Sequence, residues 1–222
     1  QKNTVLHIAA KNGHDTFITA LYKLFGVKID VNVRDNAGST PLIIAARYGH
    51  IKCIATLHAC FGNKIKYNAV NINRRNALLS AVRSGCTDCI TTLYNIYGNK
   101  MNYKAVDKDN NNALLSAAYY GHADCITALY HIYGDKFDCN VANRYDYNAL
   151  MLAVRYGHVD CITALYKAYG DKINCNVVNY NTKSDVLLLA VRYGLAHCIT
   201  TLYNIYGDKI DYNAVDYNND NA

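Results

Sequence analysis

Cys86 and Cys89 form the pair whose residue type and spacing most directly suggest chemistry. Two thiols separated by two residues can form a redox disulfide or supply half of a zinc site. No second pair with this spacing occurs among the nine cysteines. Cys89 also belongs to a recurring series, Cys53, Cys89, Cys125, Cys161 and Cys198, with Phe17 at the first place. A position that accepts Phe is a core position, so we interpret these thiols as packing residues and predict no metal site.

The histidines do not assemble into a catalytic set. His14, His50, His122 and His158 occupy one recurring position, and side chains one repeat apart cannot converge on one ion, so we expect structural hydrogen bonds from them. No nucleophile, base and orienting acid lie at related positions, and no glycine-rich loop is placed to hold a phosphate. We therefore predict that this segment is not an enzyme and that it uses no cofactor.

These residues recur because the whole chain repeats itself. One glycine series, spaced by 36, 36, 36, 36 and 37 residues, is Gly13, Gly49, Gly85, Gly121, Gly157 and Gly194. A second series with the same spacings is Gly26, Gly62, Gly98, Gly134, Gly170 and Gly207. Such a period predicts an array of stacked units. The units cover residues 1–34, 35–70, 71–106, 107–142, 143–178 and 179–215.

Each unit carries the pattern of two short helices. A Leu precedes a small pair by three residues, as Leu42 precedes Ala45, and an Ile and a Leu follow three apart, as in Ile54 and Leu57. This spacing puts the apolar residues on one face of each helix, and stacked neighbours can bury these faces together. A capping residue precedes each first helix: Thr4, Thr40, Asn76, Asn112, Asn148 or Asp185.

Tyrosines recur on the second helix of the unit. Those within it are Tyr22, Tyr94, Tyr130, Tyr166 and Tyr203, and those at its end are Tyr97, Tyr133, Tyr169 and Tyr206. We interpret both groups as packing between repeats, with the hydroxyls reaching outward. After the second Gly, residues such as 29–33 alternate apolar and polar, which predicts an extended arm leading into a turn.

The letters of the second unit resemble a known family. It contains Thr40, Pro41, Leu42, Ala45, Ala46, Gly49 and His50, and the first unit also keeps His7. This is similar to the ankyrin-repeat pattern of Thr-Pro-Leu-His, then Ala-Ala, then Gly-His. The resemblance implies an all-α solenoid of stacked helix-turn-helix units with hairpin-like loops. The period of 36 residues exceeds the family's period of about 33, and the extra residues fall around the second Gly.

The two ends of the chain lead to a further expectation. Residues 216–222 match the opening of a seventh unit, and neither end has the polar capping repeat that solenoids use. We treat residues 1–222 as a single array and expect it to be a section of a longer array or a larger protein. Any catalytic domain would then lie outside it.

The candidate binding surface follows from the resemblance, which implies a concave groove lined by the hairpin tips and the exposed side of the first helices. The two variable residues before each Gly-His position fall there. The candidate partner-binding residues are Lys11, Arg47, Tyr48, Arg83, Tyr119, Tyr120, Arg155, Tyr156, Arg192 and Tyr193. Arg and Tyr are the residue types that dominate interface energies. The alternative left open is that this pattern was copied by duplication without selection for a ligand.

Three functions are consistent with this surface. The favoured hypothesis is a protein–protein interaction module whose groove takes a partner with an acidic segment. The alternative is nucleic-acid binding, because Arg can hold phosphates and Tyr can stack on bases. The modest net charge of +6 and the interspersed Asp residues favour a protein partner over nucleic acid. The third hypothesis is a spacer array attached to an enzymatic domain outside this segment.

Composition narrows the cellular setting. A hydrophobic content of 51% excludes a disordered chain. No stretch approaches 18 consecutive apolar residues, so we expect no membrane span. We also expect a monomer. Nine cysteines at packing positions predict a reducing compartment, hence a cytoplasmic protein. The excess of Asn, Lys, Ile and Tyr is typical of an AT-rich genome. One hypothesis is an effector of an intracellular microbe, working in the host cytosol.

Overall fold

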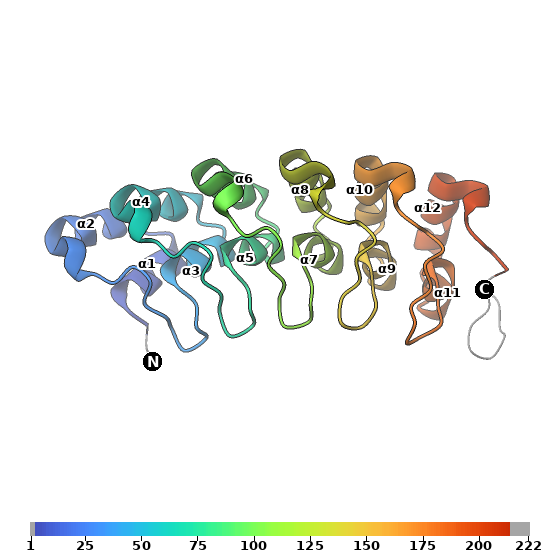
Figure 1. The fold of residues 1–222 in the computed structure, drawn as a ribbon, viewed down its shortest axis with the longest axis horizontal. Helices are drawn as coiled ribbons and strands as arrows, with labels where there is room; N and C mark the ends of the chain where they lie inside the picture. Colours follow the sequence, from blue (N-terminus) through green and yellow to red (C-terminus); the bar gives the residue numbers. More distant parts are fainter. Residues whose placement is uncertain (1–2, 214–222) are drawn as a thin grey trace. The chain divides into compact units, whose positions relative to one another are not determined.

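The computed structural model describes residues 3–213 and consists of paired helices (Figure 1). The chain divides into two compact units, Gln1–Lys108 and Asp109–Ala222. The first unit holds α1 (Val5–Asn12), α2 (Asp15–Phe25), α3 (Pro41–Arg47), α4 (Ile51–Phe61), α5 (Ala77–Arg83) and α6 (Thr87–Tyr97). The second unit holds α7 (Ala113–Tyr120), α8 (Ala123–Tyr133), α9 (Ala149–Arg155), α10 (Val159–Tyr169), α11 (Val186–Arg192) and α12 (Ala196–Tyr206). The expected seventh repeat at 216–222 lies outside the described residues.

Two layers of helices build each unit (Figure 1). In the first unit α1, α3 and α5 stack in one layer and α2, α4 and α6 in the other. In the second unit α7, α9 and α11 form one layer and α8, α10 and α12 the other. The predicted all-α, stacked helix-turn-helix architecture is therefore confirmed.

A short 3-10 helix follows the second helix of each repeat and accommodates extra residues of the 36-residue period. These 3-10 helices are η1 (Gly26–Lys28), η2 (Gly62–Lys64), η3 (Gly98–Lys100), η4 (Gly134–Lys136), η5 (Gly170–Lys172) and η6 (Gly207–Lys209). Each opens on a residue of the second glycine series, as predicted for the position of the insertion. The loop after each 3-10 helix contains no β-strand within residues 3–213, so the extended arms expected from the alternating pattern do not form strands.

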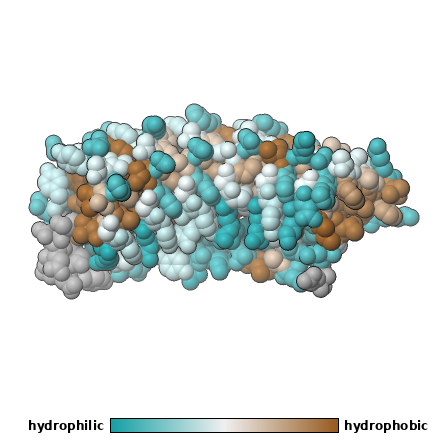
Figure 2. Space-filling model, turned by 180° about the vertical axis from the view of Figure 1, so that it is seen from behind, coloured by the Kyte–Doolittle hydropathy of each residue, from teal (hydrophilic) through white to brown (hydrophobic). Residues whose placement is uncertain are grey.

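The core is made of the residues that the repeat pattern marks as apolar. Leu42, Ile54 and Leu57 are at most 2% exposed, and the equivalent residues of the other internal repeats are equally buried. The series that begins with Cys53 is fully covered in every repeat where it is a cysteine. Phe17, which occupies this position in the first repeat, is 63% exposed. Figure 2 shows hydrophobic side chains at this α1–α2 end of the first unit. The interpretation of the recurring thiols as packing residues is confirmed.

The helix caps and hairpin tips follow the predicted residue types. The side chains of Thr40, Asn76, Asn112, Asn148 and Asp185 accept a hydrogen bond from the third backbone amide of the helix that follows. Asn71 shows how the tips close, because its side-chain oxygen accepts from the amides of Asn73 and Arg75 at 3.0 and 3.1 Å. Short side-chain-to-backbone bonds of this kind stabilise turns without strand pairing.

The tyrosines at the ends of the second helices depart from expectation. Tyr97, Tyr169 and Tyr206 are 4–7% exposed, and their hydroxyls are buried without a hydrogen-bond partner. The prediction that these hydroxyls reach outward is wrong. Each ring is covered by an aromatic residue of the preceding repeat in an edge-to-face contact, at centroid distances of 5.0–5.4 Å for the pairs His58–Tyr97, Tyr130–Tyr169 and Tyr166–Tyr206. The predicted packing between repeats is therefore confirmed for these three pairs, in which the hydroxyl is buried with the ring, whereas Tyr203 is 63% exposed.

Candidate partner-binding surface

In the first unit the candidate residues meet around one tyrosine at the end of α3. The Tyr48 ring is 44% exposed, with the ammonium of Lys11 and the guanidinium of Arg47 each 5.7 Å from its centroid. Lys11 comes from the end of α1, so a cation of one repeat contacts the aromatic ring of the next. Arg83 is half-buried at the end of α5. Candidate residues of adjacent repeats are therefore neighbours within this unit.

In the second unit the same positions form a tighter cluster. The Tyr119 and Tyr156 rings lie 4.6 Å apart, and the Arg155 guanidinium lies 5.2 Å from the ring of Tyr193. Tyr120 contacts Tyr119 edge-on at 4.7 Å. Partial burial raises the pKa of the Tyr156 hydroxyl, and a hydrogen bond to Tyr119 adds to this effect. Tyr193 is 44% exposed and Arg192 lies beside it at the surface. These contacts create a surface of aromatic rings around one cation.

Tyr147 belongs to this cluster and was not among the residues predicted from the sequence. It lies on the hairpin before α9, its ring centroid is 4.7 Å from the Arg155 guanidinium, and its hydroxyl accepts a hydrogen bond from Arg155. The equivalent hairpin positions hold Ser39, Arg75, Asn111 and Ser184. An aromatic residue in the fifth unit alone was the available signal.

Several basic residues of the hairpins are engaged within the protein. Arg75 and Asp107 form a largely buried ion pair at 2.9 Å, with side chains 14% and 3% exposed. Arg34 donates to the carbonyl oxygens of Gly38 and Val70, which joins two successive hairpins. Arg144 pairs with Asp109 at 3.3 Å. These cations connect the hairpins of successive repeats.

The recurring histidines have a structural role. Nε2 of His50 lies 2.9 Å from the carbonyl oxygen of Lys11, and Nε2 of His158 lies 3.2 Å from that of Tyr119. Each ring thus hydrogen-bonds to the end of the first helix in the preceding repeat, where backbone carbonyls have no helical partner. The expectation of structural hydrogen bonds is confirmed for these two residues.

Cys86 and Cys89 lie in different environments at the start of α6. Cys86 caps α6 by accepting a hydrogen bond from the amide of Cys89 at 3.2 Å, while Cys89 is fully buried. Neither thiol forms a disulfide, and no cluster of three or more metal-ligating side chains occurs within residues 3–213. Among the other buried thiols, desolvation raises the pKa of Cys53 to about 11 and that of Cys161 to about 12. Thiols held neutral in this way are poor nucleophiles and poor metal ligands.

Comparison with protein families identifies the repeat. A family model described as ankyrin repeats, three copies, matches residues 1–69, 56–143 and 96–179. The chain belongs to the ankyrin-repeat family. Ankyrin repeats generally serve as protein–protein interaction modules, and their fold is typically not catalytic. A comparison with curated proteins found no significant match.

The helices of this ankyrin array are short. No helix in the part of the chain that the structure describes is long and apolar enough to cross a membrane. The ankyrin first helices have seven or eight residues and the second helices eleven. The candidate residues all lie at the ends of the first helices, which places them on one layer of each ankyrin unit.

Proposed function

We propose that this ankyrin array binds a protein partner through the ends of its first helices and the adjoining hairpin tips. The observation that carries the proposal is the cluster around Arg155, where Tyr147, Tyr156 and Tyr193 each place a ring within 4.7–5.9 Å of the guanidinium. Such a preorganised side chain loses little conformational freedom on binding, and Arg with Tyr is the usual composition of an interface hot spot.

Charge favours a partner with an acidic segment. Residues 1–108 contain 15 Lys or Arg and 5 Asp, a net charge of +10, whereas residues 109–222 contain 8 and 12, a net charge of −4. The first unit would attract an acidic segment and the second would repel it. We therefore infer that an acidic segment engages the surface around Tyr48, and that the rings around Arg155 bind a less charged part of the partner. We also propose that the protein is a monomer in a reducing cytoplasm, a setting that fits cysteines without disulfides.

Charge reversal on this surface tests the proposal. The variant Arg47→Glu, Arg155→Glu, Arg192→Glu should lose capture of the partner from a cell lysate, measured by affinity purification and mass spectrometry. A matched control is Lys23→Glu, Lys52→Glu, Lys167→Glu, which makes the same charge change at exposed positions on the second helices. The control should retain the captured protein, and thermal unfolding should show that both variants fold.

Two outcomes would count against the proposal. Equal losses in both variants would mean that net charge alone drives capture, and retained capture by the first variant would exclude this surface. Nucleic acid as the ligand would be revealed by affinity that falls steeply with salt, because neutralised phosphates release counterions.

A further inference from the structure

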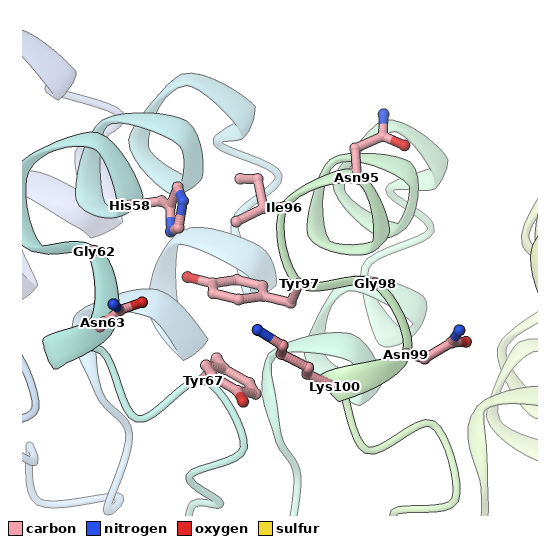
Figure 3. A pocket seen from close by; sticks show the side chains of 10 residues that line it. All are labelled: His58, Gly62, Asn63, Tyr67, Asn95, Ile96, Tyr97, Gly98, Asn99 and Lys100. Atoms are coloured by element: carbon pink, nitrogen blue, oxygen red, sulfur yellow. The ribbon is translucent and has the colours of Figure 1, made fainter.

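A cleft opens on the layer of second helices in the first unit, away from the surface proposed for the protein partner. It lies where the ends of α4 and α6 meet η2 and η3, and we call it the α4–α6 cleft. Its lining comprises His58, Gly62, Asn63, Tyr67, Asn95, Ile96, Tyr97, Gly98, Asn99 and Lys100, and its volume is about 720 Å³ (Figure 3). That volume is in the range of small-molecule sites in proteins.

Two buried polar atoms face this cleft without a hydrogen-bond partner. They are the hydroxyl of Tyr97, a residue 7% exposed, and Nδ1 of His58. Leaving a buried donor or acceptor unpaired costs free energy, which a ligand can recover. Burial raises the pKa of Tyr97 to about 12, and the nearby Tyr67 contributes, so the hydroxyl keeps its proton at neutral pH and can donate to an anion.

The walls of the cleft are aromatic. The Tyr67 and Tyr97 rings stack at 4.7 Å with an interplanar angle of 23°, and His58 meets Tyr97 edge-on at 5.4 Å. Figure 3 shows the ammonium of Lys100 and the amide of Asn63 pointing toward the space beside these rings. A planar apolar group can therefore contact a ring while a charged group reaches Lys100.

The second unit shows what the lysine at this position binds. Lys172 pairs with Asp135 at 2.6 Å, and Lys209 pairs with Asp171 at 2.5 Å. In the repeat register Lys100 corresponds to these lysines, and Asn63 stands where they have an Asp. No carboxylate lines the α4–α6 cleft. The carboxylate that Asp135 supplies to Lys172, and Asp171 to Lys209, is thus missing beside Lys100.

We propose that the α4–α6 cleft binds a small aromatic carboxylate, whose carboxylate takes the place of the missing Asp against Lys100 and the Tyr97 hydroxyl while its ring packs on Tyr67. The site needs no other part of the array. It is independent of the surface around Arg47 and Arg155, so a small ligand and a protein partner bind at the same time.

Titration of the full chain with benzoate tests this site, followed by ¹H–¹⁵N NMR. Saturable shifts are expected at the amides of Asn63, Tyr97 and Lys100, with a Kd below about 1 mM. Benzamide has the same shape without the charge and should bind at least about tenfold more weakly. Acetyl-aspartate amide has a carboxylate but no aromatic ring, and it should also bind at least about tenfold more weakly than benzoate. A benzoate affinity no higher than that of either control probe overturns the proposal.

Two variants of exposed residues locate the site. Asn63→Asp installs the carboxylate found in the second unit, so it should pair with Lys100 and reduce benzoate affinity at least about tenfold while leaving thermal stability unchanged. Lys100→Gln should do the same. A control, Lys52→Gln, removes the same charge as Lys100→Gln from an exposed residue of α4 that does not line the cleft, and it should weaken binding far less. Wild-type affinity in Asn63→Asp and Lys100→Gln, or shifts confined to other repeats, would refute the assignment.

Discussion

The imidazole of His158 lies directly on Gly121, so closely that a Cβ atom at residue 121 would be 2.8 Å from its Nδ1. His50 lies on Gly13 at the same distance. In both cases the ring also hydrogen-bonds to the carbonyl oxygen two residues before that glycine. The glycine of one repeat and the histidine of the next therefore form one close contact between repeats. This contact explains why the two residue types recur at the same positions of the repeat.

Replacing Gly121 by Ala should destabilise the protein more than replacing Gly49. Both residues have positive φ, +77° and +75°, so both alanines cost about 1–2 kcal/mol in the backbone. Only Gly121 faces a histidine ring, whereas the nearest atom to a Cβ at Gly49 is the Cys86 sulfur at 3.8 Å. Overpacking should add about 1–3 kcal/mol at Gly121. Urea unfolding measures both losses, and equal losses would mean that the close contact carries no cost.

Replacing Cys86 by His should stabilise the protein. By the repeat register, a histidine there would face Gly49 and the carbonyl oxygen of Arg47, as His50 faces Gly13 and that of Lys11. One hydrogen bond of this kind contributes about 0.5–1.5 kcal/mol. Thermal unfolding of Cys86→His and of Cys86→Ala separates the gain from the simple loss of the thiol. A melting temperature of Cys86→His below that of the wild type would show that the glycine–histidine contact does not form at this repeat.

The fold could be predicted from the sequence because the repeat shows each structural position six times. The recurring series of Cys53 marks a core site, although Phe17 at the same position of the first repeat is exposed, and Asn76 or Asp185 in place of Thr marks a cap. The tip of a side chain is less predictable. The burial of the Tyr97 hydroxyl depends on how far His58 of the preceding repeat reaches over it, which a periodic pattern does not encode.

The candidate surface was predictable to the same degree. Lys11 and Tyr48 meet because they stand at equivalent positions of adjacent repeats, as Arg155 and Tyr193 do. Tyr147 was missed because its contact with Arg155 depends on the path of the hairpin over the end of α9. The ionic role of Arg75 was missed for a similar reason, because its partner Asp107 lies on the next hairpin.

Replacing Arg74 by Gly should stabilise the first unit by about 1 kcal/mol. Arg74 has a φ of +60° at the hairpin tip, a conformation that costs a residue with a Cβ about 1–2 kcal/mol. The preceding repeat has Gly38 at this position. Asn110→Gly is the matched comparison, since Asn at φ +60° tolerates this conformation and its replacement should change stability far less. Urea unfolding tests both, and a larger gain at Asn110 would contradict the explanation.

Stability should fall in alkaline solution, starting near pH 9. Burial raises the pKa of Cys53 to about 11 and that of Cys161 to about 12, from an ordinary value of 9.0. Below pH 9 these thiols are protonated in both states, so their contribution is fully present there. Above it they ionise in the unfolded chain before they do so in the folded one, and this contribution is lost as the pH rises through the folded values.

Urea unfolding under reducing conditions at pH 7, 9 and 10.5 measures this loss, which should be on the order of 2 kcal/mol for each of the two thiols by pH 10.5. Cys161→Ala removes one titrating group and should make the decline shallower. A free energy of unfolding that stays constant between pH 9 and 10.5 would show that the buried thiols do not control alkaline stability.

The loops of successive repeats are joined by asparagines that bind only main-chain atoms. Nδ2 of Asn32 donates to the carbonyl oxygen of Lys64 at 2.8 Å, and its Oδ1 accepts from the amide of Lys66 at 2.7 Å. Asn140 makes the same two bonds to residues 172 and 174, at 2.8 and 3.0 Å. Main-chain partners are present whatever side chains the next repeat carries. Surface residues can therefore differ from one repeat to the next without a compensating change in these asparagine-to-backbone hydrogen bonds.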